Sequence, residues 1–562
     1  MSAKRALREA KTLVRQGDLQ SALQICQDVL NQTSPQDERA LENVLSVLAK
    51  IKSAQANVQA GTELPREQAD RLLALFRSGK INETFQGATT LAGRYPDSSF
   101  LHNLLGAIHL AVGNPSEAVP RHERAIALNP DNAQAHVDLA LAREALGDFD
   151  GAIESLERAI ALRPNDIAAH SNLCDILERL NRIGDLREAV GRAKKTCGDG
   201  HPLIRFRMAQ LAAREKDHAA ARQHLEAMQA DGLTQQLAEH RLALLGKACD
   251  KLGDHKAAFA AFSEANTIIA ASQQARTSVP SRYRQAIETL ITAFTEAPDT
   301  SFADAPKAER ATPVFLVGFP RSGTTLLDTI LRGHPKVEVV EEKPMVAMLR
   351  GQVGTDAGPQ RLAALSGDDI AALRKLYFRE IDKHLPEGDD DRVVIDKLPL
   401  NIISAGLIHR VFPDAKFILA TRHPCDCVLS CFMQRFGLND AMANFLDLED
   451  SAALYDRVMT LWSAYREKLP LQVHEVRYEN LVTDLEGAAR PLIAFLGLEW
   501  DDAVANYRDT AMARGHINTP SYAQVTEKLH SQASGRWENY REQMTPALPV
   551  LEPWAKALGY SA

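Results

Sequence analysis

The sequence has no run of about 18 uncharged apolar residues, the length that a membrane-spanning helix needs. Residues 1–11 carry charges at helical spacing and contain no apolar core of signal-peptide length. We therefore expect no transmembrane segment and no secretion signal, and we predict a cytoplasmic location.

Cysteine is scarce as well. The seven cysteines are scattered over 562 residues and include no Cys-x-x-Cys pair, so reduced thiols are expected rather than a disulfide framework. Cys425, Cys427 and Cys431 stand close together, but no partner ligands with zinc-type spacing accompany them. We expect no metal site.

The chain also lacks an excess of positive charge. Its 65 lysine and arginine residues are outnumbered by 73 aspartate and glutamate residues, which gives a formal net charge of −8 at pH 7. This balance argues against a general nucleic-acid-binding protein. A length of 562 residues exceeds one typical core, so we expect two or more domains.

A 34-residue period organises the first half of the chain. Residues 123–130, ERAIALNP, recur at 157–164 as ERAIALRP, and Gly79, Gly113 and Gly147 follow at the same interval. A glycine after the first helix and a proline after the second resemble the tetratricopeptide repeat. The pattern predicts an α-helical solenoid over residues 1–296, with the clearest repeats at 68–200.

Helix pairs of this kind bury their apolar faces only against neighbouring pairs and present a concave surface. We favour a role in binding a protein partner over a purely structural solenoid, and a repeat domain that pairs two subunits in a homodimer is an alternative. The small, polar and proline residues at 297–310 predict a linker, and a second domain is expected at 311–562.

Five short apolar, mostly β-branched runs alternate with helical stretches in this second half. They predict an α/β, P-loop-like domain with a mostly parallel sheet. Functional groups in such sheets gather where the strands end. The runs are 314–319, 337–340, 392–396, 416–421 and 471–476.

The turn after the first run looks like a phosphate-binding loop without its lysine. Gly318 and Gly323 match the glycines of Gly-x-x-x-x-Gly-Lys-Ser/Thr, but Thr324 occupies the position of the lysine that serves the β- and γ-phosphates of a nucleoside triphosphate. Backbone N–H groups at such a turn favour an anion. Arg321 and the neighbouring hydroxyls add donors, so we expect an anionic ligand that is not a triphosphate awaiting cleavage.

The segment Pro320-Arg-Ser-Gly-Thr-Thr325 resembles the 5′-phosphosulfate-binding loop of sulfotransferases, particularly the tyrosylprotein sulfotransferase-like branch. The resemblance covers about the last 250 residues and implies the sulfotransferase fold, with 3′-phosphoadenosine 5′-phosphosulfate as the sulfate donor. The residues that it assigns to the loop contact are Pro320, Arg321, Ser322, Gly323, Thr324 and Thr325.

The same resemblance implies a catalytic set. A His-Pro pair at 334–335 and a short strand lead to two carboxylates, and the general base of the family falls on the second, Glu342. His334 and His423 are rival bases by chemical type, although His334 precedes a proline in a turn. Lys397 and Ser521 correspond to the groups that stabilise the leaving phosphate.

The remaining donor contacts follow residue by residue. Arg422 and Ser430 match the arginine and serine that bind the 3′-phosphate in the family. Tyr478 matches a tyrosine near the adenine, and Arg536 matches a basic residue that closes on the donor. One position departs from the family: its further arginine falls on Gln434, with Arg435 next door as a substitute.

The acceptor is a hydroxyl whose carrier the sequence leaves open: a peptide tyrosine, a glycan, a lipid or a small molecule. Two other functions are weighed against sulfate transfer. One is a non-catalytic repeat scaffold whose second domain binds a nucleotide, and the other is a nucleotide kinase, which Thr324 disfavours.

Overall fold

The computed structural model describes residues 3–16, 18–32, 44–48, 50, 64–229, 232–297, 302, 305–386, 391–507 and 534–560. The chain divides into two compact units, Met1–Ile204 and Arg205–Ala562, which we describe separately. Among the helices of the described residues, none combines the length and the apolar character needed to cross a membrane.

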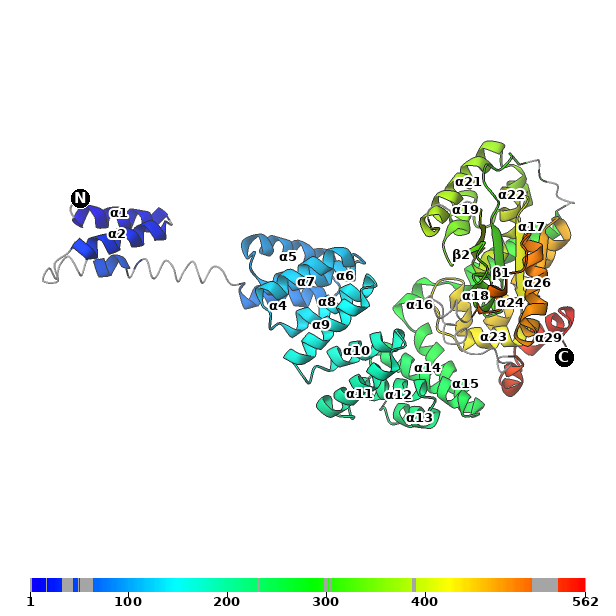
Figure 1. Cartoon of the computed structure of the whole chain (residues 1–562), viewed down its shortest axis with the longest axis horizontal. Helices are drawn as coiled ribbons and strands as arrows, with labels where there is room; N and C mark the ends of the chain where they lie inside the picture. The colour runs from blue at the N-terminus through cyan, green and yellow to red at the C-terminus, as the bar shows by residue number, and fades with distance from the viewer. Residues whose placement is uncertain are drawn as a thin grey trace. The chain divides into compact units, whose positions relative to one another are not determined.

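The first unit consists of antiparallel helix pairs, as the 34-residue period predicts (Figure 1). Gly79, Gly113 and Gly147 all adopt positive φ, between 76° and 82°, in the turn inside a pair. Asn181, 34 residues after Gly147, takes the same left-handed conformation with φ 57°, which asparagine tolerates better than most residues. The helices are α1 (Ala3–Gln16), α2 (Leu19–Gln32), α4 (Arg66–Arg77), α5 (Ile81–Arg94), α6 (Ser99–Ala111), α7 (Pro115–Leu128), α8 (Ala133–Ala145), α9 (Phe149–Leu162), α10 (Ile167–Arg179) and α11 (Ile183–Cys197).

Helix α12 (Pro202–Arg214) spans the division between the units, and further helices precede the sheet of the second unit. In the pair formed by α14 and α15, the turn residue Gly253 has φ 79°, and the carboxylate of Asp254 caps α15 by accepting from the N–H of Ala257 at 3.1 Å. The helices before the sheet are α13 (His218–Glu226), α14 (Gln235–Lys251), α15 (His255–Ala270), α16 (Gln273–Thr277) and α17 (Pro280–Glu296).

A five-stranded parallel sheet with the order β2-β3-β1-β4-β5 forms the centre of the second unit. The register places Leu316 of β1 opposite Lys397 of β3 and Ile418 of β4, and Glu341 of β2 also lies opposite Lys397. All five predicted strands are present, so the predicted α/β fold is confirmed. The strands are β1 (Val314–Gly318), β2 (Val337–Glu341), β3 (Val393–Lys397), β4 (Lys416–Thr421) and β5 (Gln472–Arg477).

Helices cover both faces of this sheet, and each face has its own apolar core (Figure 1). Alternate residues of β1 supply the two cores, with Phe315 and Val317 in one and Val314 and Leu316 in the other. The covering α-helices are α18 (Thr324–Leu331), α19 (Met345–Val353), α20 (Pro359–Ala363), α21 (Gly367–Ile381), α22 (Ala405–Val411), α23 (Pro424–Phe432), α24 (Leu448–Lys468), α25 (Tyr478–Thr483), α26 (Leu485–Leu496) and α29 (Leu548–Ala557). Short 3₁₀ helices are η1 (Asp382–His384), η2 (Pro399–Ser404), η3 (Met442–Leu446), η4 (Asp502–Val504) and η6 (Arg536–Tyr540).

The core around Phe315 continues into the helices that precede the sheet. Phe294 of α17 is fully buried, and its ring packs edge-on against Tyr465 at a centroid distance of 4.7 Å. Phe259 of α15 stacks on Phe432 at 5.0 Å, and the side chain of Asn266 donates to the carbonyl of Phe432 at 3.0 Å. The compact unit around the sheet therefore begins well before the linker at 297–310, and the sequence-based boundary remains a prediction.

One ionisable group lies inside the same core. Asp396 of β3 points to the face opposite its neighbour Lys397 and is fully buried. Its Oδ2 accepts a hydrogen bond from the Tyr377 hydroxyl at 2.9 Å, while its Oδ1 has no partner among the described residues. Burial raises the pKa of this carboxyl from 3.8 to about 7, although the hydrogen bond from Tyr377 favours the charged form.

We predict that a fragment beginning at Arg205 folds, whereas one beginning at Glu309 aggregates. The shorter fragment lacks α14, α15 and α17, so the apolar side chains that these helices cover would be exposed to water. Size-exclusion chromatography and near-ultraviolet circular dichroism measure the outcome. A monomeric Glu309 fragment that unfolds cooperatively would show that the core around the sheet is self-sufficient.

We also predict that the wild-type protein loses stability relative to Asp396→Asn as pH rises from about 4 to about 7. In this window the folded carboxyl keeps its proton and the unfolded one does not. The native state therefore binds more protons, and the free energy of unfolding falls by up to about 1.4 kcal/mol per pH unit. Urea unfolding followed by tryptophan fluorescence suits the test because all four tryptophans lie in the second unit. A difference between wild type and variant that is constant with pH would contradict the prediction.

Candidate functional site

The turn between β1 and α18 brings backbone N–H groups to the edge of the sheet where the strands end. Gly323, with φ 98°, precedes the helix and provides no side-chain cap for the first N–H groups of α18. A Cβ on Gly323 would lie 2.6 Å from the Tyr478 ring, and one on Gly318 would lie 2.6 Å from the carbonyl oxygen of Ala420. Both positions therefore require glycine, and the uncapped helix start is suited to an anion.

Arg321 occupies the tip of this turn in a left-handed conformation with φ 68°. Non-glycine residues adopt this conformation at a cost of about 1–3 kcal/mol, and such strain concentrates at functional sites. The Arg321 guanidinium Nε donates to the Ser430 hydroxyl at 3.1 Å, and the Arg321 carbonyl accepts from Arg422 Nη1 at 3.1 Å. The Arg422 guanidinium in turn lies over the Tyr478 ring, 4.9 Å from its centre. The structure thus brings together four of the residues that the sequence assigns to donor binding.

The guanidinium groups at this edge repel one another. Burial lowers the pKa of Arg321, and the positive charges of Arg422 and Arg536 lower it further. Arginine stays protonated in proteins even so, and the cluster keeps its positive charge. A bound anion would relieve this repulsion.

The buried hydroxyl of Ser322 is a further indication that this turn binds a ligand. Its hydroxyl oxygen is buried and has no hydrogen-bond partner among the described residues. Buried hydroxyls are nearly always hydrogen-bonded, so a group from outside the described chain is expected to complete this one. The neighbouring Thr324 and Thr325, which begin α18, are also buried.

Two carboxylates and a lysine meet at the ends of β2 and β3. The Lys397 ammonium is fully buried and donates to Glu341 at 2.7 Å and to Glu342 at 3.0 Å. Its third N–H has no acceptor among the described residues. The Glu342 side chain is 46% exposed and that of Glu341 only 12%, so Glu342 is the carboxylate that an incoming molecule can reach.

Charge balance keeps Lys397 protonated. Burial by itself lowers the pKa of Lys397, but the carboxylates of Asp328, Glu342 and Glu341 outweigh it, and the net pKa is raised above its ordinary value. Glu342 is held in place through its backbone, which has φ 52° and donates its N–H to the Lys397 carbonyl at 2.8 Å. The predicted base and the predicted lysine are therefore in direct contact.

The two rival histidines both have structural partners. His334 Nδ1 accepts from the N–H of Lys336 at 3.1 Å, and its Nε2 lies 2.9 Å from the Glu499 carbonyl. His423 caps α23 by accepting from the N–H of Cys425 at 3.2 Å, and its ring stacks on Trp537. Burial also lowers the pKa of His423. These contacts leave Glu342 as the better candidate for a base.

The remaining assigned residues come from the end of the chain. Arg536 lies in η6 and contacts Asp250 of α14, with its Nε 3.1 Å from the carboxylate. The backbone N–H groups on either side of Arg536 donate to Asp426 of α23 at 2.8 and 2.9 Å, and Asp426 lies 3.9 Å from Arg422. Ser521 lies outside the described residues.

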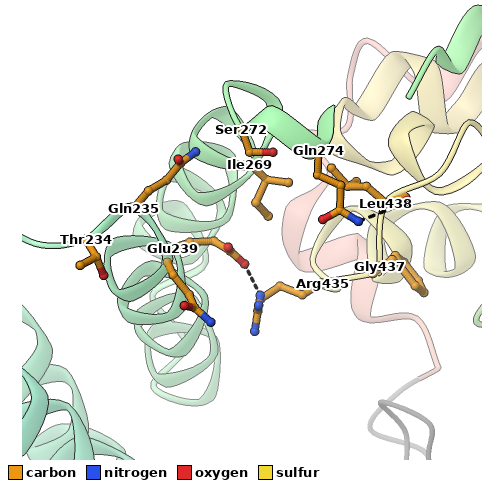
Figure 2. A pocket seen from close by; sticks show the side chains of 11 residues that line it. Thr234, Gln235, Glu239, Ile269, Ser272, Gln274, Arg435, Gly437 and Leu438 are labelled. Atoms are coloured by element: carbon orange, nitrogen blue, oxygen red, sulfur yellow. Dashed lines mark hydrogen bonds and ion pairs between the residues drawn. The ribbon is translucent and has the colours of Figure 1, made fainter. Parts of the chain in front are cut away.

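Arg435 lines a separate pocket of about 630 Å³. This residue is the suggested substitute for the family arginine whose position Gln434 occupies. Figure 2 shows the Arg435 guanidinium paired with Glu239 of α14, and Gln274 beside Leu438. The proposed substitution remains a prediction.

The cysteines beside the arginine cluster are buried free thiols. Cys431 donates to the carbonyl of Pro320 at 3.4 Å, in the turn between β1 and α18. Burial raises the pKa of Cys427 and Cys431 well above the ordinary thiol value, so both stay protonated. Among the described residues, no three His, Cys, Asp or Glu side chains are grouped as metal ligands.

Sequence reasoning missed several residues of this site. Asp328 contributes charge beside Lys397, Asp426 holds the segment around Arg536, and Asp250 contacts Arg536 itself. These three carboxylates occur in helices and carry no local motif. The sequence indicated Glu341 only as the carboxylate next to the predicted base, Glu342.

Comparison with known families agrees with both motifs. Residues 313–502 match the model of the sulfotransferase family, and residues 103–167 match a tetratricopeptide-repeat model. The chain therefore carries a sulfotransferase-family domain together with tetratricopeptide repeats.

Similar proteins include an uncharacterized protein of Aquifex aeolicus, 28% identical over 256 residues, which cover 44% of this chain and 33% of that protein. Protein-tyrosine sulfotransferase 2 of Gallus gallus is 28% identical over 44% of this chain and 69% of its own length. Protein-tyrosine sulfotransferase 1 of Danio rerio is 27% identical over 44% of this chain and 72% of its own length. The chain thus spans about a third of the Aquifex protein.

Solved structures similar to this chain include the sulfotransferase domain of the Synechococcus PCC 7002 olefin synthase. It has a TM-score of 0.32 and 20% identity, and the match covers 45% of this chain and 98% of that domain. Pseudomonas aeruginosa PilF has a TM-score of 0.32 and 17% identity over 37% of this chain and 92% of its own length.

Proposed function

We propose that this protein transfers a sulfuryl group from 3′-phosphoadenosine 5′-phosphosulfate to the hydroxyl of a tyrosine in a polypeptide. The observation that carries the proposal is the placement of two chemical groupings at one edge of the sheet. A cluster of guanidinium groups lies beside an uncapped helix start after β1, and a contact between Lys397 and Glu342 lies at the ends of the neighbouring strands β3 and β2. Sulfate transfer needs both a cradle for phosphates and an acid–base pair.

The donor's 5′-phosphosulfate fits the turn from Pro320 to Thr325. Gly323 leaves the helix start open, and the unpartnered Ser322 hydroxyl can donate to a phosphate oxygen. The Arg321 side chain extends toward Ser430, so we assign its guanidinium to the 3′-phosphate. We assign the Arg321 backbone to the loop that holds the 5′-phosphosulfate. A planar guanidinium is well suited to bidentate phosphate contacts.

Arg422, Ser430 and Tyr478 complete the proposed nucleotide site. Arg422 and Ser430 both contact Arg321, which supports a shared role at the 3′-phosphate. Tyr478 stacks on the Arg422 guanidinium and is assigned to the adenine side. Arg536 contributes a further positive charge to this cluster.

In the proposed reaction the acceptor oxygen forms a bond to sulfur while the bridging bond between sulfur and the 5′-phosphate oxygen breaks. Glu342 takes the acceptor's proton, and 3′-phosphoadenosine 5′-phosphate is the leaving group. Lys397 uses its third N–H to stabilise the negative charge that develops on the bridging oxygen. We assign Ser521 to the same leaving group from the family resemblance alone.

The acceptor class rests on similarity to proteins named protein-tyrosine sulfotransferases. A protein partner for the repeats is consistent with a polypeptide acceptor, because repeat arrays offer extended binding surfaces. From the sequence we place the activity in the cytoplasm.

The direct test is incubation of the full chain with donor labelled in the sulfuryl group and a panel of tyrosine peptides, glycans and small phenols. We expect label on tyrosine peptides and release of 3′-phosphoadenosine 5′-phosphate in equal amount. Label on glycans alone would show that the acceptor is a glycan and not a tyrosine in a polypeptide. Donor binding without transfer to any acceptor would favour the non-catalytic scaffold.

We predict that Glu342→Gln lowers the transfer rate by about 10²–10⁴-fold, the usual contribution of a general base. Glutamine keeps the size of the side chain and can still accept a hydrogen bond from Lys397, so the affinity for 3′-phosphoadenosine 5′-phosphate should be retained. Single-turnover kinetics and calorimetry separate the two effects. Near-normal turnover would remove Glu342 from this role.

We predict that Arg422→Ala weakens binding of 3′-phosphoadenosine 5′-phosphate by about 1.5–3 kcal/mol, the contribution of a charge-assisted hydrogen bond. Binding of adenosine 5′-phosphate, which lacks the 3′-phosphate, should change little. Arg422→Lys is the matched control because it keeps the charge. An equal loss for both nucleotides would show that Arg422 does not bind the 3′-phosphate.

A further inference from the structure

A carboxylate of helix α14 reaches the final segment of the chain. Asp250 accepts from Arg536 Nε at 3.1 Å and lies 3.0 Å from Arg536 Nη2, and the Tyr540 hydroxyl donates to the same oxygen at 2.6 Å. The Asp250 side chain is only 14% exposed. A carboxylate this well covered, with three donors, fixes the position of its partners.

The contact leaves part of Arg536 available. Asp250 occupies the edge formed by Nε and Nη2, and Nη2 also lies 3.3 Å from the sulfur of Met433. The other terminal nitrogen, Nη1, has no acceptor among the described residues. A guanidinium held along one edge can present its remaining N–H groups to a ligand without losing its orientation.

The backbone around Arg536 is anchored to the donor site. Gly535 and Trp537 both donate N–H groups to Asp426, which lies in α23 four residues after Arg422. Arg536 also lies close enough to Arg321 for its charge to lower the pKa of that guanidinium. Two carboxylates therefore position this segment, one from the catalytic domain and one from the helix pair that precedes it.

We propose that Asp250 is a positioning residue that orients Arg536 toward the 3′-phosphate of the donor. The proposal rests on the proposed function, because it takes the ligand to be a 3′-phosphorylated nucleotide. Asp250 then belongs to the donor site although it lies in the helical region, 286 residues before Arg536. Its contribution is to the recognition of the 3′-phosphate rather than to the sulfuryl transfer.

The test compares Asp250→Asn with wild type in the full chain, using calorimetric titration with 3′-phosphoadenosine 5′-phosphate and with adenosine 5′-phosphate. We expect the Kd of the bisphosphate to rise about tenfold, the lower end of the effect of removing a group that orients a ligand-binding side chain. The Kd of adenosine 5′-phosphate should stay within about twofold. Asp254→Asn is the matched control, since Asp254 caps α15 and pairs with Arg222 within the helical region.

A double-mutant cycle separates positioning from a general structural role. In an Arg536→Ala background, Asp250→Asn should have no further effect on the bisphosphate Kd, because the residue through which it acts is gone. Additive effects, or an equal loss for both nucleotides, would overturn the proposal. If Asp250→Asn does not fold, Tyr540→Phe replaces it. We expect Tyr540→Phe to weaken binding of the bisphosphate as well, but by a smaller factor. An unchanged ratio of the two Kd values would count against the proposal. A wild-type protein that does not prefer the bisphosphate would instead overturn the proposed function.

Discussion

Mutual repulsion among the arginines at the edge of the sheet is the constraint on which the rest of the site depends. Burial lowers the pKa of Arg321, and the nearby positive charges of Arg422 and Arg536 lower it further. The fold offsets this repulsion with Asp426, Asp250, the Ser430 hydroxyl and a backbone carbonyl. An anionic ligand would offset the remaining positive charge, and this is the physical basis on which we propose a bisphosphorylated nucleotide as the ligand.

A second charge arrangement lies at the ends of the neighbouring strands β3 and β2 and has the opposite character. There a single buried ammonium is surrounded by three carboxylates, two of them in direct contact. This excess of negative charge keeps Lys397 protonated and leaves one exposed carboxylate at the surface. The sheet holds the two arrangements at a fixed separation because Glu341, Lys397 and Leu316 are in register on adjacent strands. Acid–base chemistry and phosphate binding can then act on one molecule placed between them.

Local features of the site were predictable from the sequence. The glycine-bounded turn, the strand ends at Glu342 and Lys397 and the 34-residue period all arise from neighbouring residues, and the structure places them as expected. Contacts between distant segments were not predictable: Asp250 and Arg536 meet because α14 and α15 pack against the core around the sheet. The orientation of Asp396 follows from strand alternation, yet its partner Tyr377 depends on how α21 packs. Arg435 illustrates the same limit, since its pairing with Glu239 needs knowledge of α14.

We propose that the loop and the arginine cluster together bind a nucleotide carrying both a 3′- and a 5′-phosphate. The most direct measurement is calorimetric titration of the full chain with 3′-phosphoadenosine 5′-phosphate and with ATP at the same ionic strength. We expect clear preference for the bisphosphate, because Thr324 occupies the position of the lysine that a triphosphate needs and we assign Arg422 to the 3′-phosphate. Tighter binding of ATP would contradict it.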